Sequence, residues 1–400
     1  MNRSRRQFLQ DSSAIALAPV LPNCLATLAQ AALANRQERI LVVIQLDGGN
    51  DGINTIVPYA NDGYAKHRQE LRLRREQVLR LSDEVGLHPR LNSMSELLDA
   101  DRLAIVQGVG YPEPNRSHDV SMSIWQTARF DPAEHASYGW LGRALDSVHD
   151  AIPSPGADSI LFGNENPPAA LRGRKSSTVA LGHLRELRLK GGGMIQLDSA
   201  LSDGNADEIT TFATRALADA LQTASMLDNV VADVESRNAE YPTSQLASRL
   251  RSISQLIKSG FPTPVYYTIQ SGYDTHASQL PNHSRLLDEL GMALKAFQDD
   301  LDSAGLSDKV LTFCFSEFGR AVSENASLGT DHGSVGPVFL MGARVKSGLH
   351  GNAPDLTELQ DGELKLQFDF RQIYASILED WFSIPSQTIL AGSFSKPNIL

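Results

Sequence analysis

Short apolar runs rich in β-branched residues alternate along this chain with segments whose apolar residues recur every three or four positions. Runs of the first kind are typical of strands buried on both faces, and they predict strands over 39–47, 103–109, 265–270, 310–315 and 337–341. The second pattern predicts helices over 91–98, 118–128, 245–258, 284–301 and 368–382.

The segments between residues 265 and 315 determine the expected topology. A strand, a helix and a second strand follow one another there as a βαβ unit, which implies a parallel sheet with a right-handed crossover. We therefore predict an α/β fold in which a mostly parallel sheet is sandwiched by helices.

Residues 1–34 contain the three parts of an export signal. Residues 4–9 (SRRQFL) match the twin-arginine pattern, a short apolar run follows over 14–21, and small residues offer cleavage sites at 29–31 and 32–34. The apolar run is shorter than the roughly 20 residues that span a bilayer as a helix. We expect the twin-arginine translocase to be a partner during export and the protein to be periplasmic or extracellular. An ordinary N-terminal helix is the alternative.

Residues 35–400 are numerous enough to form one large α/β domain. Residues 150–205 are rich in Gly, Pro and Ser, and we expect a loop-rich insertion there whose short strands cap the sheet. No later segment is apolar enough over a sufficient length to predict a transmembrane anchor.

The chain carries 47 acidic and 36 basic side chains, a formal net charge of −11. Because phosphate binding needs a basic surface, this balance disfavours nucleic acid as a partner. Of the two cysteines, Cys24 lies in the predicted signal and Cys314 in the strand over 310–315. The mature chain is therefore expected to form no intrachain disulfide.

Carboxylates follow three of the predicted strands, at the end where parallel sheets bind ligands. Together with neighbouring residues before the strand at 337–341, they give the candidate metal ligands Asp47, Asp274, His276, Glu317, Asp331 and His332. Carboxylates gathered in this way repel one another unless cations neutralise them. Asp, Glu and His suit zinc, manganese or magnesium. Each residue alone could be a turn or cap residue, but their joint pattern predicts a divalent metal site.

Ser117 lies where a loop passes into the predicted helix over 118–128. A helix N-terminus favours anions, so Ser117 is a candidate nucleophile. It could instead cap the helix, unless Asn115 does so. The neighbouring His118 could be a metal ligand, a general acid or a packed core residue. With Arg320, which lies just beyond Glu317, these residues complete the candidate catalytic set.

Six short motifs occur together in the chain, at 46–52 (LDGGNDG), 115–118 (NRSH), 139–142 (GWLG), 272–276 (GYDTH), 316–320 (SEFGR) and 329–333 (GTDHG). As a set they resemble the family known as domain of unknown function 1501, whose name supplies no activity. The resemblance covers nearly the whole mature chain.

The order of these motifs is also similar to that of the alkaline phosphatase and sulfatase superfamily. This second resemblance implies an alkaline-phosphatase-like fold with Asp47 as the first metal ligand and Ser117 at the nucleophile position. It further implies that Asp274 and His276 bind a second metal, and that His332 matches a late histidine ligand. The superfamily usually carries Asp-His directly after the strand where this chain has Glu317-Phe318.

We therefore expect an exported, metal-dependent hydrolase that acts on small-molecule or glycan esters of phosphate or sulfate. Two cations would orient the ester oxygens and stabilise the charge that develops during displacement. One alternative is a non-catalytic cell-envelope protein that uses the same fold to bind glycans, sulfated polymers or a protein partner. Another is a metal-free serine hydrolase that uses Ser117 and His118.

Overall fold

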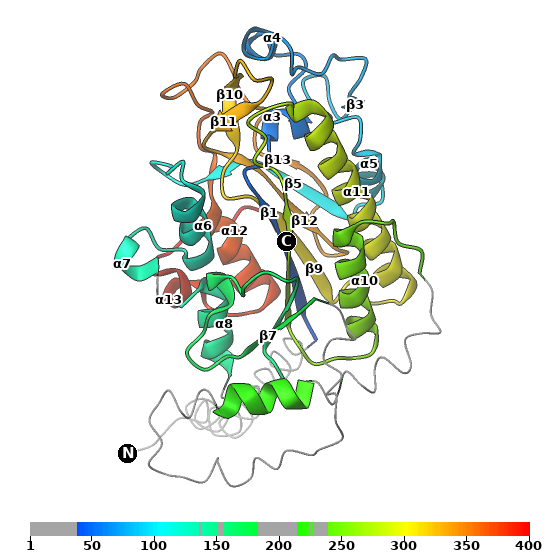
Figure 1. Cartoon of the computed structure of the whole chain (residues 1–400), viewed down its shortest axis with the longest axis vertical. Helices are drawn as coiled ribbons and strands as arrows, with labels where there is room; N and C mark the ends of the chain where they lie inside the picture. Colours follow the sequence, from blue (N-terminus) through cyan, green and yellow to red (C-terminus); the bar gives the residue numbers. More distant parts are fainter. Residues whose placement is uncertain (1–37, 136–137, 150–155, 183–213, 224–225, 227–238) are drawn as a thin grey trace, which may run out of the picture.

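The computed structural model describes residues 38–135, 138–149, 156–182, 214–223, 226 and 239–400. Across them, the central sheet has nine strands in the order β13-β5-β12-β9-β1-β8-β6-β7, with β14 beside β5 (Figure 1). Its strands are β1 (Ile40–Asp47), β5 (Leu103–Gly110), β6 (Ser159–Phe162), β7 (Thr178–Leu181), β8 (Val265–Ser271), β9 (Val310–Phe315), β12 (Gly336–Met341), β13 (Gly348–His350) and β14 (Phe368–Asp369).

Helices and two small sheets complete the described part of the chain. The labelled helices are α3 (Gly52–Thr55), α4 (Asp62–His67), α5 (Asn92–Asp99), α6 (His118–Thr127), α7 (Pro132–His135), α8 (Trp140–Val148), η1 (Ala169–Leu171), α10 (Gln245–Lys258), α11 (Gln279–Ser303), α12 (Phe370–Ser376), η2 (Ile377–Trp381) and α13 (Ser386–Leu390), and residues 214–223 are also helical. The small sheets pair β10 (Arg320–Glu324) with β11 (Thr330–His332), and β2 (Ile56–Val57) with β4 (Gly86–Leu87) and β3 (Leu79–Arg80).

Parallel pairing dominates the central sheet, which confirms the predicted fold class. β1 lies between β8 and β9 and is parallel to both, so α11 carries the chain from one side of β1 to the other. β6 and β7 continue the parallel arrangement beyond β8. β12 runs the opposite way, because it is antiparallel to both β5 and β9. The sheet is therefore mixed but mostly parallel.

The alternating side chains of β1 enter two separate cores, one on each face of the sheet. Val42, Ile44 and Leu46 pack with residues of α5, α10 and α11, whereas Leu41 and Val43 pack with residues of α6, α8, α12 and α13. Burying one such side chain stabilises the fold by roughly 1.5–3 kcal/mol. Figure 1 shows the two groups of helices on opposite sides of the sheet, as the apolar run at 39–47 predicted.

Three elements differ from their predicted form. α11 begins at Gln279 rather than 284. Pro281 lies in its first turn, where a backbone N–H has no partner inside the helix, so proline is tolerated there. The helix predicted over 368–382 is divided into β14, α12 and the π-helical η2. In the segment predicted as a capping insertion, β6 and β7 join the edge of the central sheet.

Two predictions fall largely outside the described residues. The export signal at 1–34 is one, and the part of the loop-rich segment between 183 and 205 is the other. Among the residues that the structure does describe, no helix has both the length and the apolar character needed to cross a bilayer.

A buried polar layer supports the carboxyl end of β1. Asp51 and Arg68 form an ion pair of 2.6 Å in which neither side chain is exposed. Burial acts to raise the pKa of Asp51, but the Arg68 guanidinium outweighs it and the pKa is lowered. Nε2 of the buried His283 lies 2.9 Å from Oδ1 of Asn50, and it carries the hydrogen because an amide oxygen only accepts. Burial lowers the pKa of His283 to about 4 and that of His88 to about 3.

We predict that the free energy of unfolding falls as the pH drops from about 6.5, the ordinary pKa of histidine, towards 4. In that interval the unfolded chain binds protons at positions 88 and 283, whereas the folded chain keeps both imidazoles neutral. Denaturant unfolding at several pH values should show a smaller loss in the H283Q variant than in the wild type. The H350Q variant, changed at a partly exposed histidine, should lose as much as the wild type. Equal losses in H283Q and the wild type would contradict this account.

Candidate metal centre

The turn after β1 allows the segment after β8 to come unusually close. Gly48 has a φ of +117°, and a Cβ atom there would lie 2.3 Å from the backbone nitrogen of Asp274. The N–H of Tyr273 donates a hydrogen bond of 3.1 Å to the backbone oxygen of Asp47. Glycine is therefore required at position 48, and this close approach holds Asp274 over the carboxyl end of β1.

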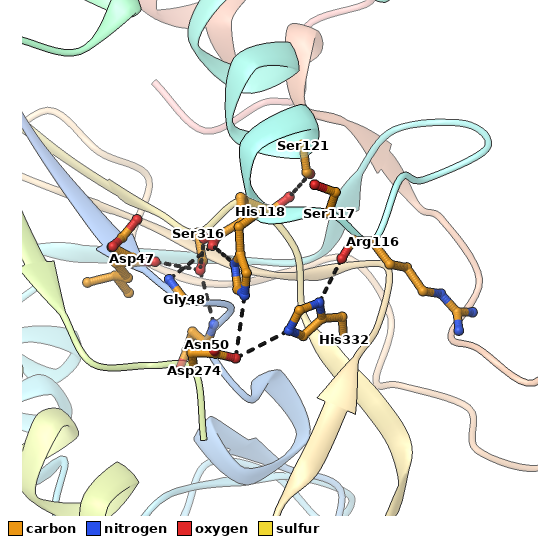
Figure 2. A network of polar contacts seen from close by, with 12 residues as sticks. Asp47, Gly48, Asn50, Arg116, Ser117, His118, Ser121, Asp274, Ser316 and His332 are labelled. Carbon is orange, nitrogen blue, oxygen red and sulfur yellow. Dashed lines mark hydrogen bonds and ion pairs between the residues drawn. The ribbon is translucent and has the colours of Figure 1, made fainter. Parts of the chain in front are cut away.

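Three imidazoles converge on one carboxylate oxygen at this place, and Figure 2 shows two of them, His118 and His332, beside Asp274. Oδ1 of Asp274 lies 3.0 Å from Nε2 of His276, 3.2 Å from Nε2 of His332 and 3.4 Å from Nε2 of His118. The Nε2 atoms of His276 and His332 are 2.9 Å apart. These side chains come from the segment after β8, from the end of β11 and from the first residue of α6. The fold thus gathers residues that are far apart in the chain.

The second ring nitrogen of each imidazole faces a hydrogen-bond acceptor. The Nδ1 contacts are His118 with Oε1 of Glu317 at 2.7 Å, His332 with the backbone oxygen of Arg116 at 2.6 Å, and His276 with Oδ1 of Asp331 at 3.2 Å. A hydrogen at Nδ1, donated to that acceptor, would leave the Nε2 lone pair free to bind a cation. Protein metal sites commonly orient their histidine ligands in this way.

Three donor atoms lie close enough together for one divalent cation, because Oδ1 of Asp274 and one ring nitrogen each of His118 and His332 are all within 4.8 Å of one another. Nε2 of His118 is buried and has no hydrogen-bond partner among the described residues. A tetrahedral cation with bonds of about 2.0–2.1 Å separates its ligand atoms by roughly 3.3 Å. The contacts of 3.0–3.4 Å around Oδ1 of Asp274 are close to that value. Imidazole and carboxylate ligands suit zinc and manganese.

Arg320 and Glu317 set the charge around these ligands. Burial acts to raise the pKa of Asp274, but Nη2 of the buried Arg320, 3.0 Å from Oδ1, outweighs it and the pKa is lowered. The hydrogen bond that His118 donates to the Glu317 carboxylate raises the pKa of His118. Glu317 has a fully buried side chain, and it also accepts a hydrogen bond of 3.0 Å from the backbone N–H of Gly48. The pairing of β10 with β11 places Arg320 opposite His332.

The predicted ligands therefore occupy three kinds of position. Asp274, His276 and His332 lie together, with His118 and Arg320 beside them. Glu317 and Asp331 do not face the cluster directly, because they contact the Nδ1 atoms of His118 and His276. Asp47 is separate, because its carboxylate accepts a hydrogen bond of 3.1 Å from Gln45 and points away from His118 in Figure 2. Burial, followed by the charge of Glu317, raises the pKa of Asp47.

Ser117 lies at the N-cap position of α6, but its hydroxyl makes no capping hydrogen bond. Its backbone N–H donates to Oδ1 of Asn115 at 2.8 Å, so Asn115 organises this turn. The exposed hydroxyl points towards α6 and away from Asp274 and His332 in Figure 2. The hydroxyl is therefore not used as a helix cap, and Ser117 directly precedes His118 in the chain.

Sequence reasoning missed two contributions to this site. Arg116 orients His332 through its backbone oxygen, and no side-chain pattern reveals a main-chain acceptor. Gly48 sets the distance between two loops, and consecutive glycines directly after a buried strand were the available signal for such a close approach.

The comparisons with known proteins agree with the resemblance noted from the motifs. The model of a family described as "Protein of unknown function (DUF1501)" matches residues 38–388. No curated protein sequence matches the chain significantly.

Several solved structures are distantly similar. The C-terminal periplasmic domain of EcEptC from Escherichia coli, in complex with zinc, has a TM-score of 0.39 and 8% identity, covering 76% of this chain and 73% of that one. The PsFucS1 sulfatase from Pseudoalteromonas sp. has a TM-score of 0.37 and 11% identity over 92% of this chain and 72% of that one. The lipoteichoic acid synthase LtaP from Listeria monocytogenes has a TM-score of 0.36 and 9% identity over 82% and 74%. With TM-scores below 0.5, these likenesses carry no argument about activity.

We predict that G48A destabilises the protein more than G260A does. Both glycines have positive φ, which costs a residue with a Cβ roughly 1–2 kcal/mol, but Gly260 has no atom within 4 Å of a built Cβ. G48A adds a clash with the backbone of Asp274. Denaturant unfolding measures the loss in free energy of unfolding for each variant. The difference between the two losses gives the cost of the clash apart from the cost of positive φ. Equal losses in free energy would show that the close approach at Gly48 is not required.

Proposed function

This chain belongs to the family described as protein of unknown function DUF1501, and we propose that it is an exported, metal-dependent hydrolase of phosphate or sulfate esters. The family description names no activity, so the proposal rests on the geometry of the candidate metal centre. One observation carries it, namely the convergence of three imidazole Nε2 atoms on Oδ1 of Asp274.

His118, Asp274 and His332, whose donor atoms lie within 4.8 Å of one another, would hold the cation. His276, with Nε2 3.0 Å from Oδ1 of Asp274, would be the fourth ligand. When bound there, a divalent cation would act as a Lewis acid that polarises an ester oxygen and stabilises the charge developing during displacement. Glu317 and Asp331 would orient two of the imidazoles and make them stronger ligands. In this proposal His118 is a ligand rather than a general acid. The cluster supports one cation where the motifs had suggested two.

Two cationic groups, Arg320 and the bound metal ion, would favour an anionic substrate. Asp274, Glu317 and Asp331 bring three negative charges and Arg320 brings one positive charge, so a divalent cation makes the group neutral instead of negative. Nε and Nη1 of Arg320 are buried and have no hydrogen-bond partner among the described residues, which strengthens the local positive field. A phosphate or sulfate ester would be attracted to such a site, whereas a neutral ester would gain little.

Ser117 would supply the nucleophile. Its hydroxyl is exposed and makes no capping hydrogen bond, so rotation about χ1 is open to it. Attack by Oγ on phosphorus or sulfur would transfer that group to serine, while the hydroxyl proton leaves with the alcohol product. Water would then release phosphate or sulfate and restore the serine. Both nitrogens of His118 face carboxylates, which does not favour a metal-free Ser117–His118 pair.

Export is part of the proposal because of the twin-arginine pattern at residues 4–9. We predict that changing Arg5 and Arg6 together to lysine leaves the protein in the cytoplasm of a host that has the pathway, while the unchanged chain reaches the periplasm. Cell fractionation with immunoblotting measures this. Export of both proteins to the same extent would exclude the twin-arginine route.

We predict that the protein purified without chelator contains about one divalent cation per chain. The D274A and H332A variants should lose it, because each removes a ligand. E317Q should lower the affinity by about 10–100-fold, because it weakens the support of a ligand histidine. D47N is the matched control and should keep its cation, since Asp47 points away from His118. Inductively coupled plasma mass spectrometry measures the content. Loss of metal in D47N but not in D274A would show that Asp47, and not Asp274, is a metal ligand.

For activity, we predict that the metal-loaded protein hydrolyses 4-nitrophenyl phosphate or 4-nitrophenyl sulfate. S117A should lower kcat by about 100-fold or more, while its metal content stays that of the wild type. Normal turnover in S117A would make water the nucleophile. A stoichiometric cation without hydrolysis of either ester class would favour the non-catalytic binding protein.

A further inference from the structure

Residues 66–80 form a basic segment in an acidic protein. They carry six basic and two acidic side chains, a net charge of +4, whereas the whole chain has a net charge of −11. Arg68 is buried against Asp51, and Arg80 pairs with Asp83. The other basic side chains of the segment are exposed and have no ion-pair partner among the described residues, and they form the basic surface: Lys66, Arg72, Arg74 and Arg75.

The local backbone directs the arginines of the basic surface outward. Leu71 and Leu73 are buried, whereas Arg72 and Arg74 are exposed. This alternation is typical of an extended segment with one face towards the protein, so Arg72 and Arg74 point to the same, outer side. The guanidinium of Arg75 lies 5.5 Å from the ring centroid of Tyr59, which holds it beside them.

The basic segment is anchored on β10, the strand that begins with Arg320 of the metal centre. The carboxylate of Glu324, at the last position of β10, accepts hydrogen bonds of 2.8–3.0 Å from the backbone N–H groups of residues 69–71. Arg68 donates from Nε to the backbone oxygen of Val322 at 2.7 Å. At about 3.3 Å per residue, Glu324 lies roughly 13 Å along β10 from Arg320. Figure 1 shows α4 and β3 at the same end of the molecule as β10 and β11, so one long anionic ligand can reach both places.

A groove of about 590 Å³ lies beside the basic surface, between the segment that holds Leu73 and the first turns of α11. Its charged lining residues are Arg90, Arg285 and Asp288. Because Arg285 also pairs with Glu289 at 2.6 Å, the groove itself carries little net charge. Its lining includes the amide of Gln77 and the hydroxyl of Ser284, which can hydrogen-bond to the hydroxyls of a sugar. The groove has the size of a ligand pocket.

We propose that the basic surface and this groove bind an acidic polysaccharide, and that the substrate ester is part of such a polymer. The groove would take sugar rings, and the arginines would take the acidic groups, because a guanidinium forms paired hydrogen bonds with oxyanions. Membranes and protein partners are usually bound by apolar side chains as well as basic ones, and residues 66–80 expose no large apolar side chain. That the polymer is the substrate rests on the proposed function, whereas its binding does not.

Isothermal titration calorimetry with dextran sulfate tests the binding, with unsubstituted dextran and phosphatidylglycerol vesicles as comparisons. We expect the protein to bind dextran sulfate and not dextran. Added salt should weaken the binding, because it screens exposed charges. No binding to dextran sulfate would overturn the proposal. Binding to the vesicles but not to dextran sulfate would also overturn it, in favour of a membrane surface.

Two matched triple variants place the binding on the basic surface. R72Q/R74Q/R75Q should bind dextran sulfate about tenfold more weakly, since each exposed ion pair contributes a few-fold at most. K309Q/R344Q/K396Q removes the same charge near the amino ends of β1 and β9, at the other end of the sheet, and should bind like the wild type. Denaturant unfolding checks that both variants fold. Equal weakening in the two variants would overturn the site. Because binding needs no turnover, this result does not depend on the activity of the metal centre.

Discussion

The arrangement of this end of the molecule depends on the crowding around Oδ1 of Asp274. Three imidazole nitrogens and the guanidinium of Arg320 lie within 3.0–3.4 Å of that oxygen. The Nε2 atoms of His276 and His332 are 2.9 Å apart, an arrangement that is costly unless a proton or a cation lies between the two nitrogens. A divalent cation among the Nε2 atoms and Oδ1 would supply that link. The protein keeps a costly polar cluster, which is typical of a functional site.

The sheet makes this convergence possible. β1 is parallel to both β8 and β9, so the segments that follow these three strands leave the sheet at one end. The glycine turn at Gly48 then brings the segment after β8 against that of β1. Glu317, at the end of β9, ties the turn and His118 together through two hydrogen bonds. Parallel pairing therefore brings the segments after the three strands to one end of the sheet, and the contacts of Gly48 and Glu317 fix how their side chains are oriented.

Much of the fold could be predicted from the chain, because buried strands and amphipathic helices leave periodic apolar patterns. The neighbourhood of Asp274 and Glu317 followed from their positions after parallel strands. The direction of a side chain did not follow, since it depends on the loop conformation. Asp47 ends β1 but turns towards Gln45, and His118 points into the cluster from the start of α6. The β10–β11 pair, which aligns His332, is too short and polar to leave a periodic signal.

X-ray absorption at the zinc edge of the zinc-loaded protein tests the central claim most directly, because it reports the ligand atoms themselves. The account predicts a four-coordinate shell at about 2.0–2.1 Å that contains three imidazoles and one carboxylate oxygen. In the H118A variant the shell should contain two imidazoles. A shell of oxygen ligands alone, or a wild-type spectrum in H118A, would contradict the claim that the three histidines and Asp274 form one metal site.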